Sequence, residues 1–165
     1  MRFYKYVFLI MFIFSPSFLF SQILVPRDID VFINGISILD ETMRRLIDRN
    51  DNYYTRIQRF VDYMTDIVFN ENIDEYSIFK TEYQEVLQID PPQELDNTFR
   101  RMGWDRDGHK KYMTIFFGFT LLFWQEEYES TIFEVFLNTF YINDLEIIKK
   151  NMDDLNDAFM GWDND

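Results

Sequence analysis

A heptad spacing of apolar residues is the feature that most limits what this chain can fold into. Between residues 29 and 67, every third or fourth residue is apolar, with one exception. These positions are Ile29, Phe32, Ile36, Leu39, Met43, Leu46, Asn50, Tyr53, Ile57, Phe60, Met64 and Ile67. Such spacing places all of them along one side of an α-helix. The pattern therefore predicts helix throughout, and only Asn50 interrupts the apolar side.

Two arrangements of this stretch fit the pattern. In the first, one helix runs from about residue 28 to residue 69, and its ~40 residues would span about 60 Å. In the second, residues 49–52 form the turn of a helical hairpin, because Asn and Asp favour turns and helix caps. The heptad phase continues across the interruption, which favours the single helix, but the sequence leaves both arrangements open.

Further helical segments follow towards the C-terminus. Amphipathic spacing predicts helices over about 73–87, 92–102 and 131–149, and a short one near the end of the chain. Residues 112–124 are apolar on every face, so we expect a central, fully buried helix there. Few glycines and prolines occur, and no flexible linker divides the chain. The sequence predicts one all-α domain over residues 22–165, a bundle of about five to seven helices.

The first 21 residues have the layout of a secretory signal peptide. Arg2 and Lys5 precede an apolar run that ends at Phe20, and the small residue Ser21 follows. The run is short for a membrane span, which needs about 20 apolar residues. We expect cleavage after Ser21, with cleavage after Ser17 or an uncleaved anchor as alternatives. The segment predicts an exported protein, periplasmic or extracellular, without a stable membrane span once the signal is removed.

Charge and cysteine content narrow the function. The chain has 29 acidic and 16 basic residues in 165, a formal net charge of −13. Phosphate backbones repel so acidic a surface, which argues against nucleic acid as a partner. The chain has no cysteine, which excludes disulfides, thiol catalysis and thiolate metal sites. We expect no cofactor.

One six-residue pattern occurs twice, as MGWDRD at residues 102–107 and MGWDND at residues 160–165. A glycine just after a helix commonly adopts the left-handed conformation that ends it, and the next residue packs back on the last turn. We therefore interpret Gly103 with Trp104, and Gly161 with Trp162, as helix stops. The first copy supplies Phe99 as the partner of Trp104. The second has Asp157 at that position, which leaves Trp162 available to a partner.

No catalytic motif stands out. His109 is the only histidine, and no nucleophile motif accompanies it. Asp153, Asp154 and Asp157 match the D-D-x-x-D pattern of isoprenoid synthases over five residues only, and a solvated acidic face explains them better. The pattern around Gly108 lacks the carboxylates of a calcium loop. We expect no enzyme and no metal site.

Two functional hypotheses remain. The first is a non-catalytic interaction module that binds a protein partner or a second copy of itself, with Trp162, His109, Arg100 and Arg101 as candidate contacts. The second is a carrier of a small apolar ligand, because nineteen Phe and eight Met could line a cavity.

Overall fold

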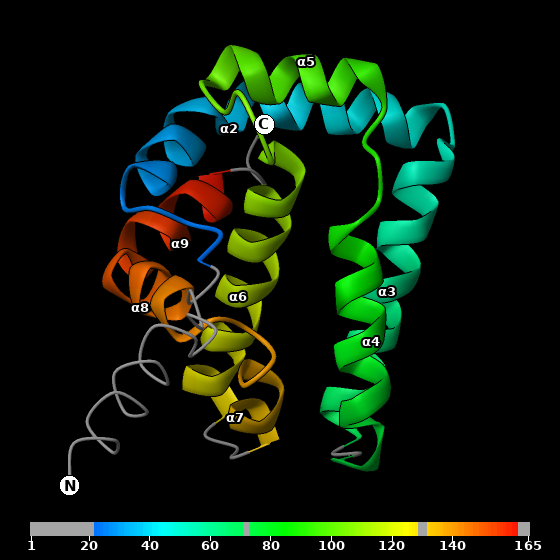
Figure 1. The fold of residues 1–165 in the computed structure, drawn as a ribbon, viewed down its shortest axis with the longest axis vertical. Helices are drawn as coiled ribbons and strands as arrows, with labels where there is room; N and C mark the ends of the chain where they lie inside the picture. The colour runs from blue at the N-terminus through cyan, green and yellow to red at the C-terminus, as the bar shows by residue number, and fades with distance from the viewer. Residues whose placement is uncertain (1–21, 71–72, 129–131, 162–165) are drawn as a thin grey trace, which may run out of the picture.

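The computed structural model describes residues 22–70, 73–128 and 132–161, which fold into one helical domain (Figure 1). The described residues contain eight α-helices and one short 3-10 helix. They are α2 (Arg27–Asp48), α3 (Asn52–Phe69), η1 (Ile73–Glu75), α4 (Tyr76–Leu87), α5 (Gln93–Met102), α6 (Gly108–Tyr128), α7 (Ile132–Leu137), α8 (Ile142–Lys150) and α9 (Met152–Gly161). The prediction of an all-α fold is confirmed. The proposed signal segment lies outside the described residues.

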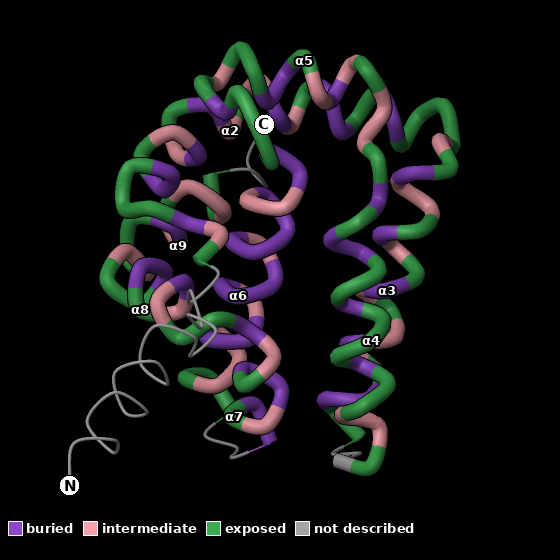
Figure 2. Tube along the Cα trace, in the orientation of Figure 1, coloured by how far each residue is buried: buried purple, intermediate pink, exposed green. Residues whose placement is uncertain are grey.

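Helix α6 runs through the middle of the molecule (Figure 1). Helices α3 and α4 form a two-helix arm on one side of it, and α8 and α9 lie on the other side. Helix α7 packs at the lower end of α6 and also contacts α4. Helices α2 and α5 lie side by side across one end. Most of α6 is buried (Figure 2), as its apolar residues on every face predict.

The heptad stretch forms two helices that meet at a corner, so the single long helix is wrong. Asn50 has a left-handed φ of 52°, and the N–H of Asp51 bonds the carbonyl of Leu46 at 2.9 Å. This bonding closes the C-terminus of α2 in the manner of a Schellman motif. The Asp51 side chain then accepts a bond from the Tyr53 N–H at 2.9 Å and caps α3. Asn50 is thus a turn residue and not a buried helical one.

The predicted helix over residues 131–149 is also divided. Helix α7 ends at Leu137, and the N–H groups of Thr139 and Phe140 bond carbonyls three residues back. Asn and Thr compete poorly for helical conformation, which favours a break at residues 138–139. The break lets α8 pack closely on α6, where a Cβ added at Gly118 would lie 2.6 Å from Ile148 Cδ1.

Polar contacts join α2 to α5. Glu94 accepts bonds from Arg45 Nε at 2.6 Å and from Arg49 Nη2 at 2.9 Å. Below this exposed pair, the hydroxyls of Thr42 and Thr98 lie 3.0 Å apart in the core. Both arginines therefore meet an acidic side chain of the same fold.

Candidate partner-binding groove

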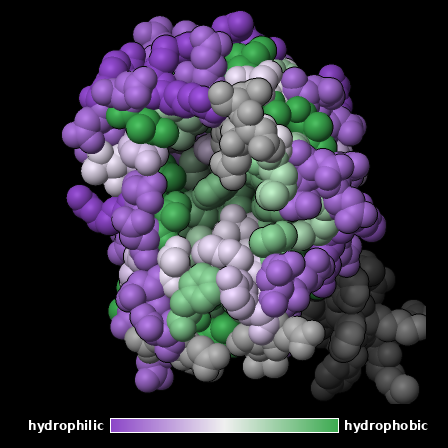
Figure 3. Space-filling model, turned by 180° about the vertical axis from the view of Figure 1, so that it is seen from behind, coloured by the Kyte–Doolittle hydropathy of each residue, from purple (hydrophilic) through white to green (hydrophobic). Residues whose placement is uncertain are grey.

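An open, mostly apolar groove lies between α6 and α9. It has a volume of about 260 Å³. Its lining consists of Phe116, Phe119, Thr120, Phe123, Asn156, Phe159 and Met160. Figure 3 shows apolar surface around a hollow on the rear of the molecule, with hydrophilic surface at its edge. We call this feature the α6–α9 groove.

The groove exists because, among the described residues, no further helix covers one face of α6. Phe116, Thr120 and Phe123 recur at helical spacing along that face and are only half-buried. Stacked rings form the floor: the Phe119 and Phe159 centroids lie 4.7 Å apart, and those of Phe119 and Phe123 lie 5.9 Å apart. The apolar run predicts that residues 112–124 are buried on every side of the helix. This prediction is wrong for the face that carries Phe116, Thr120 and Phe123.

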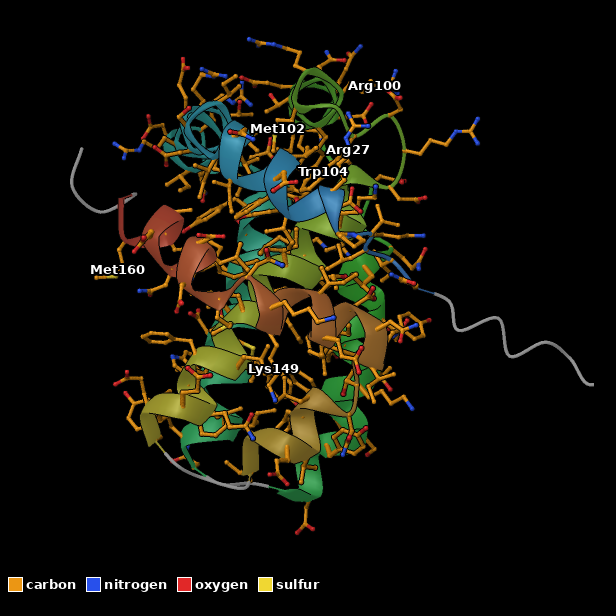
Figure 4. All side chains as sticks on the ribbon, turned by 90° about the vertical axis from the view of Figure 1, so that its left-hand side faces the viewer. Arg27, Arg100, Met102, Trp104, Lys149 and Met160 are labelled. Carbon is orange, nitrogen blue, oxygen red and sulfur yellow. The ribbon has the colours of Figure 1, made fainter. Side chains whose placement is uncertain are left out.

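Met160 forms the outer edge of the groove. It is 60% exposed and lies at the solvent side of α9 (Figure 4). Such exposure is unusual for a large apolar side chain next to an aromatic floor, and grouped apolar surface of this kind often marks an interaction site.

Carboxylates border the groove on both helices. Asp153 and Asp157 are exposed on α9, one helical turn from the lining residues Asn156 and Met160. On α6, the exposed Glu127 follows Phe123 by four residues and so continues the same face. The groove therefore combines an aromatic floor with an acidic edge.

The first copy of the repeated pattern ends α5 as a helix stop. Gly103 has a left-handed φ of 109°. The Trp104 N–H bonds the Phe99 carbonyl at 2.9 Å, and their ring centroids lie 5.8 Å apart. Trp104 is buried beside α2 (Figure 4). This is the geometry that the sequence predicts for Gly103, Trp104 and Phe99.

The second copy differs from the first. Gly161 is the last residue of α9, and its φ is not left-handed. The left-handed stop predicted at Gly161 is therefore wrong. Trp162, the predicted partner contact, lies outside the described residues, so its role stays a prediction.

A buried carboxylate fixes Trp104 in place. Asp28 Oδ1 accepts bonds from Trp104 Nε1 at 3.0 Å and from Lys111 Nζ at 2.8 Å. Lys111 stands near the N-terminus of α6, where the helix dipole opposes a cation, and Asp28 neutralises it. Sequence pattern does not reveal this contact, because 83 residues separate the two charges.

His109 is a core residue, which corrects its assignment to a partner surface. Its Nε2–H donates to the Val86 carbonyl at 2.8 Å, so Nδ1 accepts from the Tyr53 hydroxyl at 2.9 Å. Burial lowers the pKa of the imidazole. A neutral ring with both nitrogens bonded inside the fold has no atom left for a partner.

Arg100 and Arg101, the other candidate contacts, are exposed near the end of α5. Arg100 Nη2 lies 2.8 Å from Asp96 Oδ2, one turn earlier on the same helix. Surface pairs of this kind contribute little to stability and break readily. Neither arginine lies in the α6–α9 groove.

The acidic triplet of α9 lies on the solvent side of the helix. Asp153, Asp154 and Asp157 are all exposed. Within residues 22–70, 73–128 and 132–161, no group of three or more Asp, Glu or His side chains is placed to hold a metal ion.

The aromatic residues proposed to line a ligand cavity mostly pack against one another. Phe60 contacts Phe117 and Phe79 with centroids 4.9 and 5.6 Å apart, and Phe79 contacts Phe136 at 4.9 Å. An open cleft of about 450 Å³ does lie between α3 and α4. Charged side chains of both signs, Arg56, Arg59, Glu82 and Glu85, contribute to its lining, so it is less apolar than the α6–α9 groove.

Two further findings complete this description. None of the helices in the described ranges combines the length and the apolar character that a membrane span requires. Comparisons of the chain with protein-family models, with curated proteins and with solved structures found no match.

Proposed function

We propose that this protein is an exported, non-catalytic interaction module that binds an amphipathic helix of a partner protein in the α6–α9 groove. One observation carries the proposal: the groove joins a half-exposed aromatic floor to an acidic edge. The export part rests on the signal-peptide layout of residues 1–21.

The shape of the groove favours a helical segment. Its floor follows α6 from Phe116 to Phe123, about two helical turns or roughly 10 Å. Amphipathic helices bind such grooves by inserting apolar side chains one turn apart. Large aromatic residues such as the half-buried Phe116, Phe123 and Phe159 supply most of the apolar area in contacts of this type.

The charge of the groove edge specifies the partner further. Asp153, Asp157 and Glu127 would repel acidic side chains and attract basic ones beside the bound apolar face. The partner helix should therefore carry Lys or Arg next to its apolar stripe. A second copy of this chain is a poorer match, because its surface is itself acidic.

The test uses a synthetic amphipathic peptide with leucine along one face and lysine beside it. The same peptide with glutamate in place of lysine is the charge control. Met160→Glu places a charge at the groove edge without disturbing the core. Ile142→Glu is the matched control, because Ile142 is 63% exposed on α8 and lies outside the groove. Calorimetric titration should show binding to wild type and to Ile142→Glu, and about tenfold weaker binding to Met160→Glu.

Three results would overturn the proposal. If the lysine peptide binds wild type and Met160→Glu with equal affinity, the groove is not its binding site. Uptake of the neutral dye N-phenyl-1-naphthylamine without peptide binding would favour the apolar-ligand carrier. A dimer in light scattering that Met160→Glu dissociates would assign the groove to a second copy.

A further inference from the structure

Residues 22–25, which follow the predicted cleavage site, are held against the helical domain by hydrogen bonds and by burial of a side chain. The N–H of Ile23 lies 3.1 and 3.2 Å from the two carboxylate oxygens of Asp144, and the N–H of Leu24 lies 2.8 Å from Oδ1. The Leu24 side chain is 0% exposed. Residues 22–25 therefore form a strap that Asp144, in the first turn of α8, holds against the core.

Asp144 is a buried carboxylate without a cation beside it. It is 0% exposed, and burial raises its pKa, while the bonds from Leu24 and Ile23 act in the opposite direction. Its hydrogen bonds in the described structure come from backbone N–H groups, and no lysine or arginine of the described ranges forms an ion pair with it. A buried charge of this kind is costly unless an opposite charge lies near it.

We propose that signal removal supplies this opposite charge: the α-amino group of Gln22, freed by cleavage after Ser21, pairs with Asp144. Hydrolysis consumes one water molecule and breaks the amide bond between Ser21 and Gln22. It leaves a carboxylate on the departing segment and an ammonium group on Gln22. The inference rests on the export part of the proposed function.

Chain geometry brings the new ammonium group close to the carboxylate. The Ile23 nitrogen lies 3.1 and 3.2 Å from the two carboxylate oxygens of Asp144. Because one residue spans at most about 3.6 Å, the Gln22 nitrogen lies within about 7 Å of the same oxygens. An α-amino group is mostly protonated at neutral pH or slightly below, since its ordinary pKa is about 7.7–8.0. Before cleavage, the same nitrogen is an uncharged amide.

The surroundings leave few other charges for this role. The cavity beside Asp144, lined in part by Ile23 and Thr139, measures about 10 Å³, about the space of one water molecule. A hydrated cation does not fit there. The lysines nearest to Gln22 already have acidic partners, because Lys111 pairs with Asp28 and Lys110 lies 3.7 Å from Asp107.

The test compares four full-length chains made in a bacterial host that exports them. The first carries Gln22→Ala, which prevents cyclisation of an N-terminal glutamine and keeps the amino group. The second adds two alanines between Ser21 and residue 22, which moves the amino group away from Asp144. The third and fourth repeat this pair with Asp144→Asn. Intact mass locates the cleavage site, and circular dichroism at pH 7 gives the unfolding midpoint.

We expect mature Gln22→Ala to begin at residue 22. The insertion should lower the midpoint by about 3 °C when residue 144 is Asp and leave it unchanged when residue 144 is Asn. An insertion effect that is absent, or equal in both backgrounds, would overturn the pairing. A chain that begins at residue 18 or retains its first residues would overturn the cleavage site. Failure to export would overturn the export proposal and, with it, the pairing that rests on it. The groove experiment is independent of all these results.

Discussion

At the scale of single residues, His109 shows how burial decides a role that the sequence leaves open. The residue lies between Asp107 and Lys110 in a polar stretch, which suggests a surface position. Helix α6 begins at Gly108, and its first turn brings His109 between Tyr53 of α3 and the carbonyl of Val86 in α4. The imidazole thus links three helices as a neutral group.

This burial makes stability depend on pH. The folded imidazole has a lowered pKa, so below about pH 6.5 the unfolded chain binds a proton that the folded chain does not. The contribution of His109 is complete above that pH and is lost as the pH falls through it. His109→Gln can keep both hydrogen bonds and does not titrate. The stability difference between wild type and His109→Gln, from urea unfolding, should fall as the pH is lowered from 7.5 to 5.5, because the buried imidazole resists protonation. If the free energies of unfolding of wild type and His109→Gln depend on pH in the same way, the buried imidazole does not cause the pH dependence between pH 7.5 and 5.5.

At the scale of helices, two ends with the same hydrogen bonding have different residues at the left-handed position. Gly103 ends α5 and Asn50 ends α2, and in both the next residue bonds a carbonyl five residues back. Asn tolerates this conformation better than most residues that have a Cβ. The Gly103 end was predictable because Gly-Trp follows Phe99 at the spacing of a helix stop. Asn50 was not, because the heptad phase continues unbroken across it.

The two glycines of the repeated pattern should respond differently to alanine. Gly103→Ala forces a Cβ into a left-handed backbone and should lower the free energy of unfolding by about 1–2 kcal/mol. Gly161→Ala, at a helical position with no atom within 4 Å of the new Cβ, should change it by less than about 0.5 kcal/mol. Urea unfolding measures both. Equal effects would contradict the distinction between a stop and a helical end.

The limits of sequence reasoning are visible in particular elements. Periodicity predicted α5 and the C-terminal end of α4 to within one residue, because prolines separate the two helices. Helix α4 begins at Tyr76, three residues after the predicted start, because η1 precedes it. It could not find the break at residues 138–139, where the apolar spacing continues into α8. It also overestimated the burial of α6, because Phe116 and Phe123 look the same in sequence whether or not a helix covers them.

The polar contacts that organise the fold were beyond prediction for a different reason. Asp144 bonds residues 120 and 121 positions away, and Asp28 bonds a lysine 83 positions away. Local pattern contains no information on such pairs. The groove depends in the same way on where α9 lies across α6, which only the tertiary packing decides.

At the scale of the whole molecule, the dominant property is a large excess of negative charge. Self-repulsion of a formal charge of −13 opposes the compact state. The described ion pairs on the surface, such as Arg100 with Asp96, offset little of it.

Added salt should therefore stabilise the fold. Raising the salt concentration from about 10 mM to about 150 mM shortens the Debye length from about 30 to about 8 Å and screens this repulsion. We expect the unfolding midpoint to rise by a few degrees, equally in sodium chloride and potassium chloride, as followed by circular dichroism. A fall in the unfolding midpoint on adding salt would mean that attraction within surface ion pairs outweighs the repulsion among the excess acidic residues. Peptide binding in the groove should weaken over the same range, because its charge attraction is screened too.

The strap at residues 22–25 has a consequence for the order in which the molecule forms. Its anchor, Asp144, lies 120 residues further along the chain than Leu24, so on the proposed export route residues 22–25 would dock only after α8 had crossed the membrane. Contacts between such distant positions close late, because the intervening chain loses the most freedom in joining them. On that route the domain could not be completed segment by segment, because residues 22–25 would stay undocked until α8 had crossed the membrane.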